Sequence, residues 1–494
     1  MYINILKNCT GFSTCALSEN FILLYVRTIG NLCTFAPAYY RNIMIFKRKI
    51  YEKLLDWKKN NGHKALLIEG ARRIGKSTIV EEFAKNEYKS YILIDFNNAD
   101  KLVFETFENY SNNLDTLFLM LSTIYKVPLH KRESVIIFDE VQRYPFVRQL
   151  VKYLVKDGRY DYIETGSLIS IHKNVKDITI PSEEKGIKMY PMDFEEFCIA
   201  MGEEQKIEYV KSCFQNKKPL IQGLHNNMMH LFRQYMIVGG MPKSLASYLE
   251  NNRNFQASDI EKRDIIHLYR EDIMKIEGKY KSKVLAIFDQ IPGLLSKHEK
   301  RVVFKNVVEN SDIAQYQETF FWLADSMIAN ECFNCSDPNV GLSMNEDRTY
   351  VKCYMGDTGL LVSHAFSENE VSDGELFKEL LFGKLSVNEG MLYENAIAQM
   401  LVAAGHKLYF YTHYNNEKHR NDIEIDFILS NNSKLKYKIF PIEVKSTDRY
   451  KTTSLERFYE KYHERIGINY VIHPKNLEVK DNWVFLPPYM TFCL

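Results

Sequence analysis

The segment that most constrains how this chain can fold is residues 66–78, where an apolar run, a glycine-bounded loop and a predicted helix start follow one another. The loop reads Gly70-Ala71-Arg72-Arg73-Ile74-Gly75-Lys76-Ser77-Thr78, which is the complete phosphate-binding pattern G-x-x-x-x-G-K-[ST]. In such a loop the backbone N–H groups converge on anionic oxygens, and the following helix N-terminus adds partial positive charge. A basic turn that binds nothing is the alternative, but the flanking strand and helix favour a polyphosphate site.

Side chains at the end of the loop and after a second strand complete the expected chemistry. Lys76 can reach the terminal phosphates, and the Ser77 hydroxyl can bind Mg²⁺. Residues 134–140 are a short apolar run that ends in Asp139 and Glu140, which suits a strand covered on both faces of a parallel sheet. Ligands bind at the carboxyl ends of such strands. We therefore expect Asp139 to hold Mg²⁺ and Glu140 to orient an attacking water.

A third strand is predicted over residues 160–164, and Thr165-Gly166-Ser167 follows it. A hydroxyl at this strand end could contact the terminal phosphate, and both Thr165 and Ser167 are candidates for that contact. An ordinary strand-ending turn explains the same residues equally well, so both interpretations stay open.

Length and charge limit the classes of function. A chain of 494 residues is too long for one core and suggests about three domains. With 64 Lys and Arg against 63 Asp and Glu, the net charge is +1, so a nucleic-acid surface would have to be local. The apolar run at residues 21–26 is short and Arg27 interrupts it, so we expect no membrane span and a cytoplasmic protein.

The first 43 residues stand apart from the rest. They show neither helical nor strand periodicity, whereas an amphipathic helix is predicted from Met44 to Trp57. We interpret residues 1–43 as a non-native or disordered extension, with Met44 as the true start of the protein. A peptide that lies on the surface of the following domain is the alternative.

Pattern changes divide the remaining chain into four segments. Residues 44–198 alternate between strand and helix patterns, which predicts a parallel sheet with helices on both faces. Residues 199–275 are expected to form a helical lid or connector, and residues 276–384 a winged-helix-like module with an acidic linker. The winged form serves DNA binding as well as protein contacts, but the sequence has no basic recognition stripe. Residues 385–494 form the last predicted domain.

The last domain contains a predicted hairpin with charged residues. Residues 423–429 alternate as one strand, and residues 440–446 are its return strand. Such a hairpin brings Asp426 and Glu443 together near one edge, and Lys445 shares a face with Glu443 by the strand period of two.

A predicted helix over residues 388–404 adds Glu394 to this group. Two acids and a lysine on paired strands, with a helix glutamate, are the arrangement of Mg²⁺-dependent phosphodiesterases. In that arrangement Glu394, Asp426 and Glu443 would bind the metal. Lys445, paired with Glu443, would orient the attacking water and stabilise the negative charge that develops on the phosphate. The alternative is a solvated, charged hairpin face.

Together these motifs resemble a family of prokaryotic AAA-type ATPases whose C-terminal region is a domain of unknown function with an endonuclease-like core. The similarity covers about residue 44 to the end. It rests on the loop and acid motifs above and on four further segments: Tyr-Pro-Met-Asp-Phe-Glu-Glu-Phe at 190–197, Gly-Gly-Met-Pro at 239–242, Tyr-Arg-Glu-Asp-Ile at 269–273 and Glu-Val-Lys-Ser at 443–446.

The resemblance implies an α/β fold: a P-loop AAA-type ATPase domain, a helical lid, a winged-helix-like middle and a C-terminal α/β domain of the PD-(D/E)xK restriction-endonuclease type. It implies ATP and Mg²⁺ as cofactors. Lys76, Ser77 and Thr78 would bind phosphate and Mg²⁺, while Asp139 would bind Mg²⁺ and Glu140 would be the base.

This chain departs from the family at one point. Many relatives carry a Gly-Arg pair before the Tyr-Pro segment, whereas residues 181–186 here read Pro-Ser-Glu-Glu-Lys-Gly. Any arginine role at that point is therefore in doubt, and Lys185 is no more than a candidate substitute.

Two functions from different classes follow from these patterns. The first is an ATPase that couples its nucleotide state to a C-terminal DNA-directed, nuclease-like module. The second is a nucleotide-dependent switch or scaffold whose C-terminal fold contacts proteins and cleaves no nucleic acid. ATP is the expected partner in both, a DNA partner belongs to the first, and a homo-oligomer is left open.

Overall fold

The computed structural model describes residues 44–60, 63–166, 182–276, 280–297, 302–303, 313–367, 374–382, 389–415, 417, 419–431 and 438–494. The predicted extension over residues 1–43 and the candidate Ser167 lie outside the described residues. None of the helices in the described part of the chain is long and apolar enough to cross a membrane.

The first sheet has five parallel strands in the order β2-β3-β4-β1-β5. Its strands are β1 (Ala65–Glu69), β2 (Ser90–Asp95), β3 (Ser134–Asp139), β4 (Asp161–Gly166) and β5 (Glu184–Lys188). The predicted parallel sheet is confirmed, and β3 is buried along its whole length. The sequence did not indicate β5, because this edge strand is polar and largely exposed.

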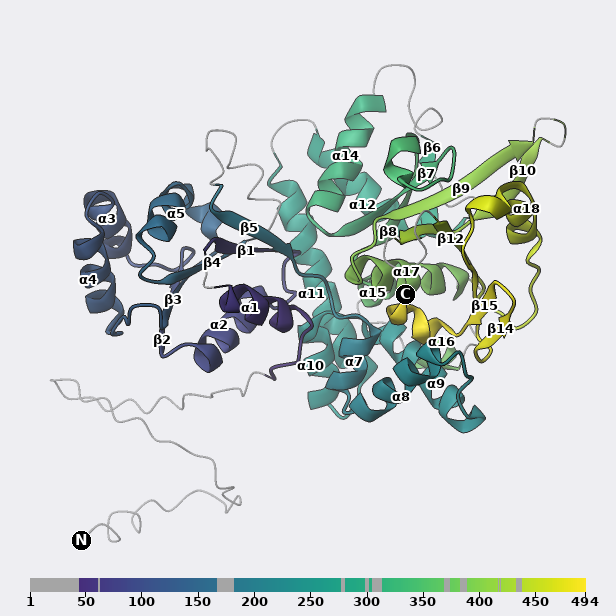
Figure 1. Ribbon diagram of the computed structural model, residues 1–494, viewed down its shortest axis with the longest axis horizontal. Helices are drawn as coiled ribbons and strands as arrows, with labels where there is room; N and C mark the ends of the chain where they lie inside the picture. Colours follow the sequence, from purple (N-terminus) through teal and green to yellow (C-terminus); the bar gives the residue numbers. More distant parts are fainter. Residues whose placement is uncertain are drawn as a thin grey trace, which may run out of the picture. The chain divides into compact units, whose positions relative to one another are not determined.

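Helices cover both faces of this sheet (Figure 1). Alternate side chains of a strand point to opposite faces. Leu66 and Ile68 pack on one face with helices α1 (Ile50–Lys59) and α2 (Lys76–Glu87). Ala65 and Leu67 pack on the other face with a second set of helices. That set is α3 (Lys101–Tyr110), α4 (Leu114–Tyr125) and α5 (Pro145–Asp157).

Helix α1 begins at Ile50 rather than at the predicted Met44. The residues just before the helix bind another part of the chain. Arg48 Nε donates to Glu196 Oε1 at 3.1 Å, and Lys49 Nζ donates to Asp193 Oδ2 at 2.5 Å. These long-range contacts hold the residues just before the helix, and periodicity alone could not show them.

Among the described residues, helix α7 and then four helices within residues 204–274 follow the sheet, and a lid or connector role for residues 199–275 stays a prediction. The helices are α7 (Phe194–Ala200), α8 (Glu204–Gln215), α9 (Gln222–Val238), α10 (Pro242–Glu250) and α11 (Phe255–Met274). Helix α7 begins with a capping box, in which Asp193 and Glu196 each accept a hydrogen bond from the other's backbone N–H. The Gly239-Gly240 turn joins α9 to α10.

The second sheet has the strand order β10-β9-β7-β8-β6, and β7 pairs with β9 in parallel. This sheet therefore takes strands from both sides of residue 385, where the sequence predicts a domain boundary. The winged-helix form stays a prediction. The elements of this part are α12 (Tyr280–Ser296), β6 (Val302–Val303), α14 (Ile313–Asp325), β7 (Ala329–Cys335), β8 (Glu346–Met355), α15 (Thr358–Ala365), α16 (Gly374–Leu381), α17 (Glu389–Ala403), β9 (Leu408–Asn415) and β10 (Arg420–Ile425).

The third sheet has the order β11-β12-β13-β15-β14, with an antiparallel strand at each edge and parallel pairing between them. Its elements are β11 (Phe427–Asn431), β12 (Lys438–Val444), β13 (Asn469–Ile472), β14 (Glu478–Lys480), β15 (Trp483–Leu486) and helix α18 (Thr453–Tyr462). Four 3₁₀ helices complete the described elements: η1 (Val141–Arg143), η2 (Leu342–Asn345), η3 (His463–Arg465) and η4 (Pro488–Cys493).

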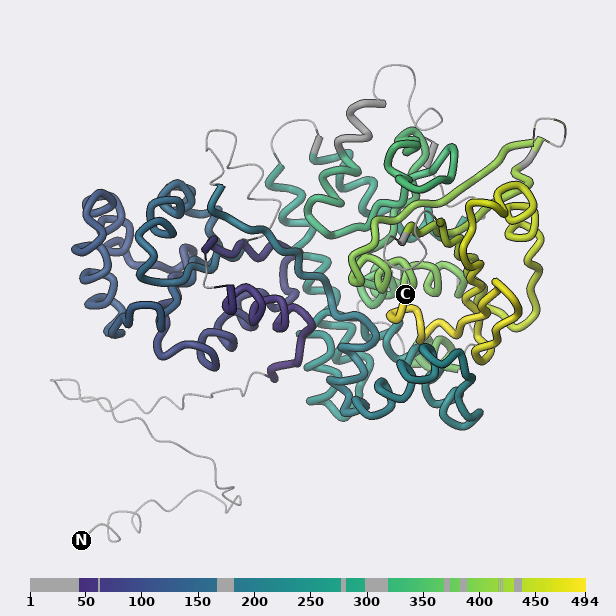
Figure 2. Tube along the Cα trace, viewed as in Figure 1, coloured from purple at the N-terminus to yellow at the C-terminus, as the bar shows by residue number. Residues whose placement is uncertain are grey.

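The strand predicted over residues 423–429 is two strands in the structure. β10 forms a long hairpin with β9 (Figure 2), whereas β11 pairs with β12 in the third sheet. Asp426 lies at the passage between the two sheets, and its Oδ2 accepts a hydrogen bond from Val444 N at 2.8 Å. The alternating pattern could not show this change of sheet, because Ile425 and Phe427 are both buried on either side of it.

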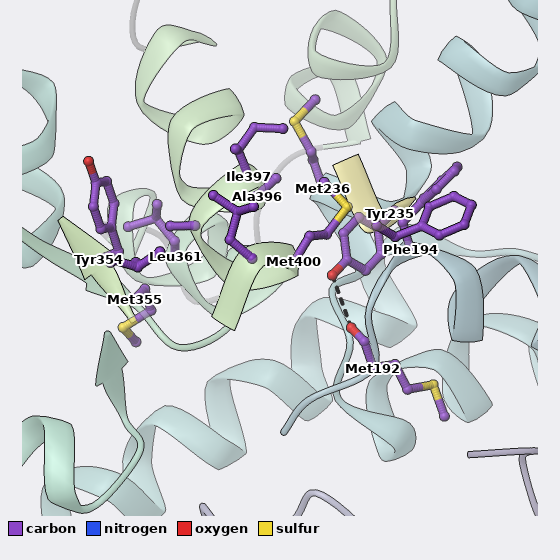
Figure 3. Packing of buried hydrophobic residues seen from close by; sticks show 14 of the residues in the cluster. Met192, Phe194, Tyr235, Met236, Tyr354, Met355, Leu361, Ala396, Ile397 and Met400 are labelled. Atoms are coloured by element: carbon purple, nitrogen blue, oxygen red, sulfur yellow. Dashed lines mark hydrogen bonds between the residues drawn. The ribbon is translucent and has the colours of Figure 1, made fainter. Parts of the chain in front are cut away.

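One apolar core joins helices from distant parts of the sequence (Figure 3). Phe194 of α7 and Tyr235 of α9 meet at a ring separation of 5.7 Å. Met400 of α17 belongs to the same cluster. The Tyr235 hydroxyl donates to Met192 O at 2.9 Å, which satisfies the polar end of a fully buried ring.

The Gly239-Gly240 turn is packed too closely for a side chain. A Cβ atom on Gly240 would lie 2.1 Å from Met192 O. We expect Gly240→Ala to lower the free energy of unfolding by about 2–3 kcal/mol, because backbone would have to move to relieve the clash. Urea unfolding of the full chain measures this change. Gly223→Ala in α9 is the matched control, since its Cβ would meet nothing within 4 Å, and an equal loss in both variants would contradict the packing argument.

Candidate functional site

The phosphate-binding loop lies between β1 and α2, at the carboxyl end of the central sheet strands. Gly75 has a φ of 90° and Arg73 a φ of 68°. A Cβ on Gly70 would lie 2.6 Å from Met189 O, so glycine is required there for close packing. The sequence thus places each loop glycine where the backbone path needs it.

Lys76 opens helix α2 and is only 7% exposed. Its Nζ donates to Gly70 O and Ala71 O, both at 2.9 Å, so the ammonium is held inside the loop by carbonyl groups. Burial lowers the pKa of Lys76 to about 8, against the opposing effect of Glu140 and Asp139. An anion in the loop would favour the charged form of this lysine.

Asp139 ends β3 and accepts two hydroxyl hydrogen bonds on one oxygen. Ser77 Oγ donates to Asp139 Oδ1 at 2.8 Å, and Thr165 Oγ1 donates to the same atom. A hydroxyl and a carboxylate in contact are oxygen ligands of the type that Mg²⁺ prefers. Ser77 and Asp139 therefore fit a magnesium ion next to the loop. Thr165, one of the two sensor candidates, is fully buried at the end of β4 and contacts this carboxylate.

Glu140 follows Asp139 directly and has a φ of 54°. Its Oε2 accepts a hydrogen bond from Gln142 Nε2 at 2.5 Å. The left-handed backbone turns the side chain of Glu140 out of the strand direction. The sequence predicted Glu140 as the acid next to the metal ligand but gave no indication of Gln142 as its partner.

The loop is also held from outside the sheet. Arg72 Nη1 lies 2.8 Å and 2.9 Å from the two carboxylate oxygens of Asp272 in α11. The Tyr269 hydroxyl donates to Arg72 O at 3.2 Å. Both partners belong to the segment at residues 269–273, so the structure shows what this part of the resemblance does: it contacts the phosphate loop.

Arg48 makes a second contact to the loop, and the sequence gave no signal for it. It is buried, and its Nη1 donates to Ile74 O at 3.0 Å while its Nη2 donates to Tyr190 O at 2.6 Å. A lone arginine before a helix has no motif, so only the folded chain shows that it binds the loop.

The charged residues predicted in the C-terminal region also come together. Lys445 Nζ donates to Glu443 Oε1 at 2.6 Å, as the shared strand face predicts. Burial raises the pKa of Glu443 to about 7, although Lys445 opposes this shift. Asp426 lies beside this pair, held by Val444 N.

A lysine that the sequence did not single out lies among the predicted metal ligands. Lys352 of β8 has its Nζ 3.5 Å from Glu394 Oε1 and 3.7 Å from Asp426 Oδ1. It also lies 3.6 Å from Glu424 Oε1. A positive charge of the protein itself thus faces the oxygens that a divalent ion would need, which is a poor fit for a second cation. Among the residues that the structure describes, no three His, Cys, Asp or Glu side chains form a group able to hold a metal.

Family comparisons divide the chain into three matched segments. Residues 62–198 match the AAA domain family. This segment is an AAA-type ATPase domain. Residues 229–370 match a domain of unknown function, DUF8612, and residues 389–490 match another, DUF4143. Neither of these two descriptions includes a nuclease, so the predicted endonuclease-like core stays a prediction.

Two archaeal structures are similar to the chain at low identity. One is the Walker-type ATPase Paby2304 of Pyrococcus abyssi, with 16% identity, a TM-score of 0.36, and coverage of 65% of this chain and 96% of that one. The other is Cdc6p from Pyrobaculum aerophilum, with 13% identity, a TM-score of 0.25, and coverage of 71% and 97%. A comparison with curated proteins gives no match.

The contact between α11 and the loop of the ATPase domain gives a testable prediction. We expect Asp272→Ala to weaken ATP affinity about threefold to fivefold, or about 0.6–1 kcal/mol, because Arg72 would lose the partner that fixes the loop. Calorimetric titration with ATP and Mg²⁺ measures the change. Asp289→Ala is the matched control, since it removes the ion pair of Arg270, on the same helix, without touching the loop. Equal affinities in the two variants would contradict this role of Asp272.

Proposed function

We propose that this protein binds ATP and Mg²⁺ in the loop at residues 70–78 and hydrolyses the terminal phosphoanhydride bond. The observation that carries the proposal is the convergence of Lys76, Ser77, Asp139 and Glu140 at one end of the parallel sheet. The match of residues 62–198 to the AAA domain supports it.

Each residue has a distinct part in the proposed reaction. The backbone N–H groups of the loop bind phosphate oxygens, and Lys76 exchanges its two carbonyl contacts for the terminal phosphates. Ser77 and Asp139 would hold Mg²⁺, which would supply charge neutralisation at the phosphates. Glu140 orients the attacking water and accepts its proton. Thr165 positions Asp139 through its hydroxyl, and Ser167 remains a candidate for the terminal phosphate.

Two substitutions separate binding from turnover. We expect Lys76→Ala to weaken ATP affinity about 100-fold or more, because two charge-assisted hydrogen bonds to phosphate would be lost. We expect Glu140→Gln to leave ATP affinity unchanged and to lower kcat about 10²–10⁴-fold, because the base is gone but the loop is intact. Titration with ATP and phosphate-release assays measure the two effects.

Lys85→Ala is the matched control for the first substitution. Lys85 lies on the same helix as Lys76, but it is exposed and pairs with Glu81 on that helix. Full turnover in Glu140→Gln would contradict the proposed role of Glu140 as the base. Tight ATP binding in Lys76→Ala would contradict the proposed role of the loop in binding ATP.

The second part of the proposal concerns what the ATPase drives. The loop is bonded directly to α11 through Arg72, and α11 in turn is bonded to α15 and to the residue that follows it. Ser363 of α15 donates to Asp259 of α11 at 2.5 Å, and Arg263 Nη2 donates to Phe366 O at 3.0 Å. A loop that moves when nucleotide binds would therefore shift α11 and change its contacts with α15. We favour a nucleotide-dependent switch for this reason, and the coupled nuclease is the competing function.

Duplex DNA distinguishes these two functions. If the C-terminal domain is a nuclease, the protein should bind duplex DNA with an affinity that falls steeply as salt rises, because contacts to DNA phosphates release counterions. For the switch we expect ATP turnover of the full chain to be the same with and without duplex DNA, and the DNA to stay intact in Mg²⁺. Turnover assays and gel analysis of the DNA measure both. DNA-stimulated turnover with cutting that is lost in Lys445→Ala would establish the nuclease instead.

A further inference from the structure

Lys352 is a fully enclosed cation in the C-terminal half of the chain. It lies on β8 and is only 1% exposed. Among the residues that the structure describes, its Nζ finds no hydrogen-bond partner at normal distance. Lysine is rarely this buried unless opposite charges surround it, because moving an ammonium out of water is costly.

Three carboxylates from separate elements supply that opposite charge. Glu394 comes from α17, Glu424 from β10, and Asp426 from the passage between β10 and β11; all three lie within 3.7 Å of the ammonium. Burial alone would lower the pKa of Lys352, but these carboxylates outweigh it and raise the pKa above its usual range. The lysine therefore stays charged where it is.

The same oxygen atoms already have partners. Glu394 Oε1 faces Lys352 and also accepts a hydrogen bond from the Tyr354 hydroxyl. The other oxygen of Asp426 accepts from Val444 N. A magnesium ion needs oxygens at about 2.0–2.1 Å in near-octahedral geometry, and it would have to share them with an ammonium. Two cations side by side at one set of carboxylates repel each other strongly.

We propose that Lys352 is the resident cation of this cluster and takes the place of the divalent ion that the sequence pattern predicts at these carboxylates. The ammonium joins strand β8, within the segment of residues 229–370, to α17, β10 and Asp426 in the segment of residues 389–490. The C-terminal half is then a contact module in which Lys352 partly neutralises these carboxylates and no Mg²⁺ is held at Asp426. This inference goes beyond ATP hydrolysis and does not depend on it.

Binding of Mn²⁺, followed by its electron paramagnetic resonance signal, tests the proposal. The protein is the full chain without nucleotide and with Asp139→Asn, which removes the proposed metal ligand next to the phosphate loop. We expect no Mn²⁺ to bind to this protein at millimolar concentration. Bound Mn²⁺ that disappears when Asp426→Asn is added would overturn the proposal.

Removal of the ammonium should open the site. We expect Lys352→Gln, in the same Asp139→Asn background, to gain one Mn²⁺ per chain, because three carboxylates would be left without their cation. The further change Asp426→Asn should abolish that gain. Lys407→Gln is the matched control, since Lys407 pairs with Glu346 but is half exposed, and it should gain no Mn²⁺.

A folded Lys352→Gln protein that binds no Mn²⁺ would also overturn the proposal, because the lysine would then not stand in for a metal. Circular dichroism establishes whether this variant folds. If it does not fold, the Mn²⁺ measurement on the protein that keeps Lys352 decides alone. Binding that Asp426→Asn abolishes contradicts the proposal, and the absence of such binding supports it.

Discussion

The carboxylate of Asp357 is the buried contact on which much of the arrangement depends. One oxygen accepts from Gly240 N at 2.5 Å and from Gln399 Nε2 at 3.1 Å, and the other accepts from Leu360 N at 2.9 Å. Burial raises the pKa of Asp357, while the hydrogen bonds from Gly240 and Leu360 oppose this shift. A charged group in this position is tolerated only because its oxygens are satisfied, so α9, α15 and α17 must keep their places for the carboxylate to remain buried.

The Gly239-Gly240 turn, which Asp357 holds, also lies close to the phosphate loop. Gly240 O accepts from Met192 N at 2.8 Å, which binds the turn to the segment that leaves the first sheet. A Cβ placed on Gly75 would lie 3.6 Å from Pro242 Cγ, so the turn approaches the loop itself. With Asp272 on Arg72 and Arg48 on Ile74, the loop is bounded by groups from three distant segments. A nucleotide that reshapes the loop therefore changes contacts well outside the ATPase domain.

The sequence predicts what is local and misses what is distant. The loop glycines, Lys76, Ser77 and the Asp139-Glu140 pair form short motifs whose spacing carries the geometry, and the parallel sheet follows from alternating patterns. β5 escaped prediction because an edge strand need not be apolar. The partners Arg48 and Lys352 were not predicted because each is a single polar residue whose contacts come from parts of the chain far apart in sequence. Gln142 lies only two residues after Glu140 and was missed because a lone polar residue there forms no motif. The passage between two sheets at Asp426 was not predicted, because the apolar residues Ile425 and Phe427 continue the alternating apolar and polar pattern across it.

Lys352 shows why the acidic residues of a motif do not by themselves determine its chemistry. Glu394, Asp426, Glu443 and Lys445 have the spacing of a metal-dependent site, and the fold does bring them close together. The sign of the charge at their centre, however, is set by a strand that precedes the motif in the chain. A buried carboxylate cluster that faces an ammonium of the same chain depends on that ammonium, because removing one partner would leave buried charges uncompensated. A divalent ion would add an open coordination position and a means of activating water. The identity of the one cation at the centre therefore separates a contact module from a phosphodiesterase built of the same carboxylates.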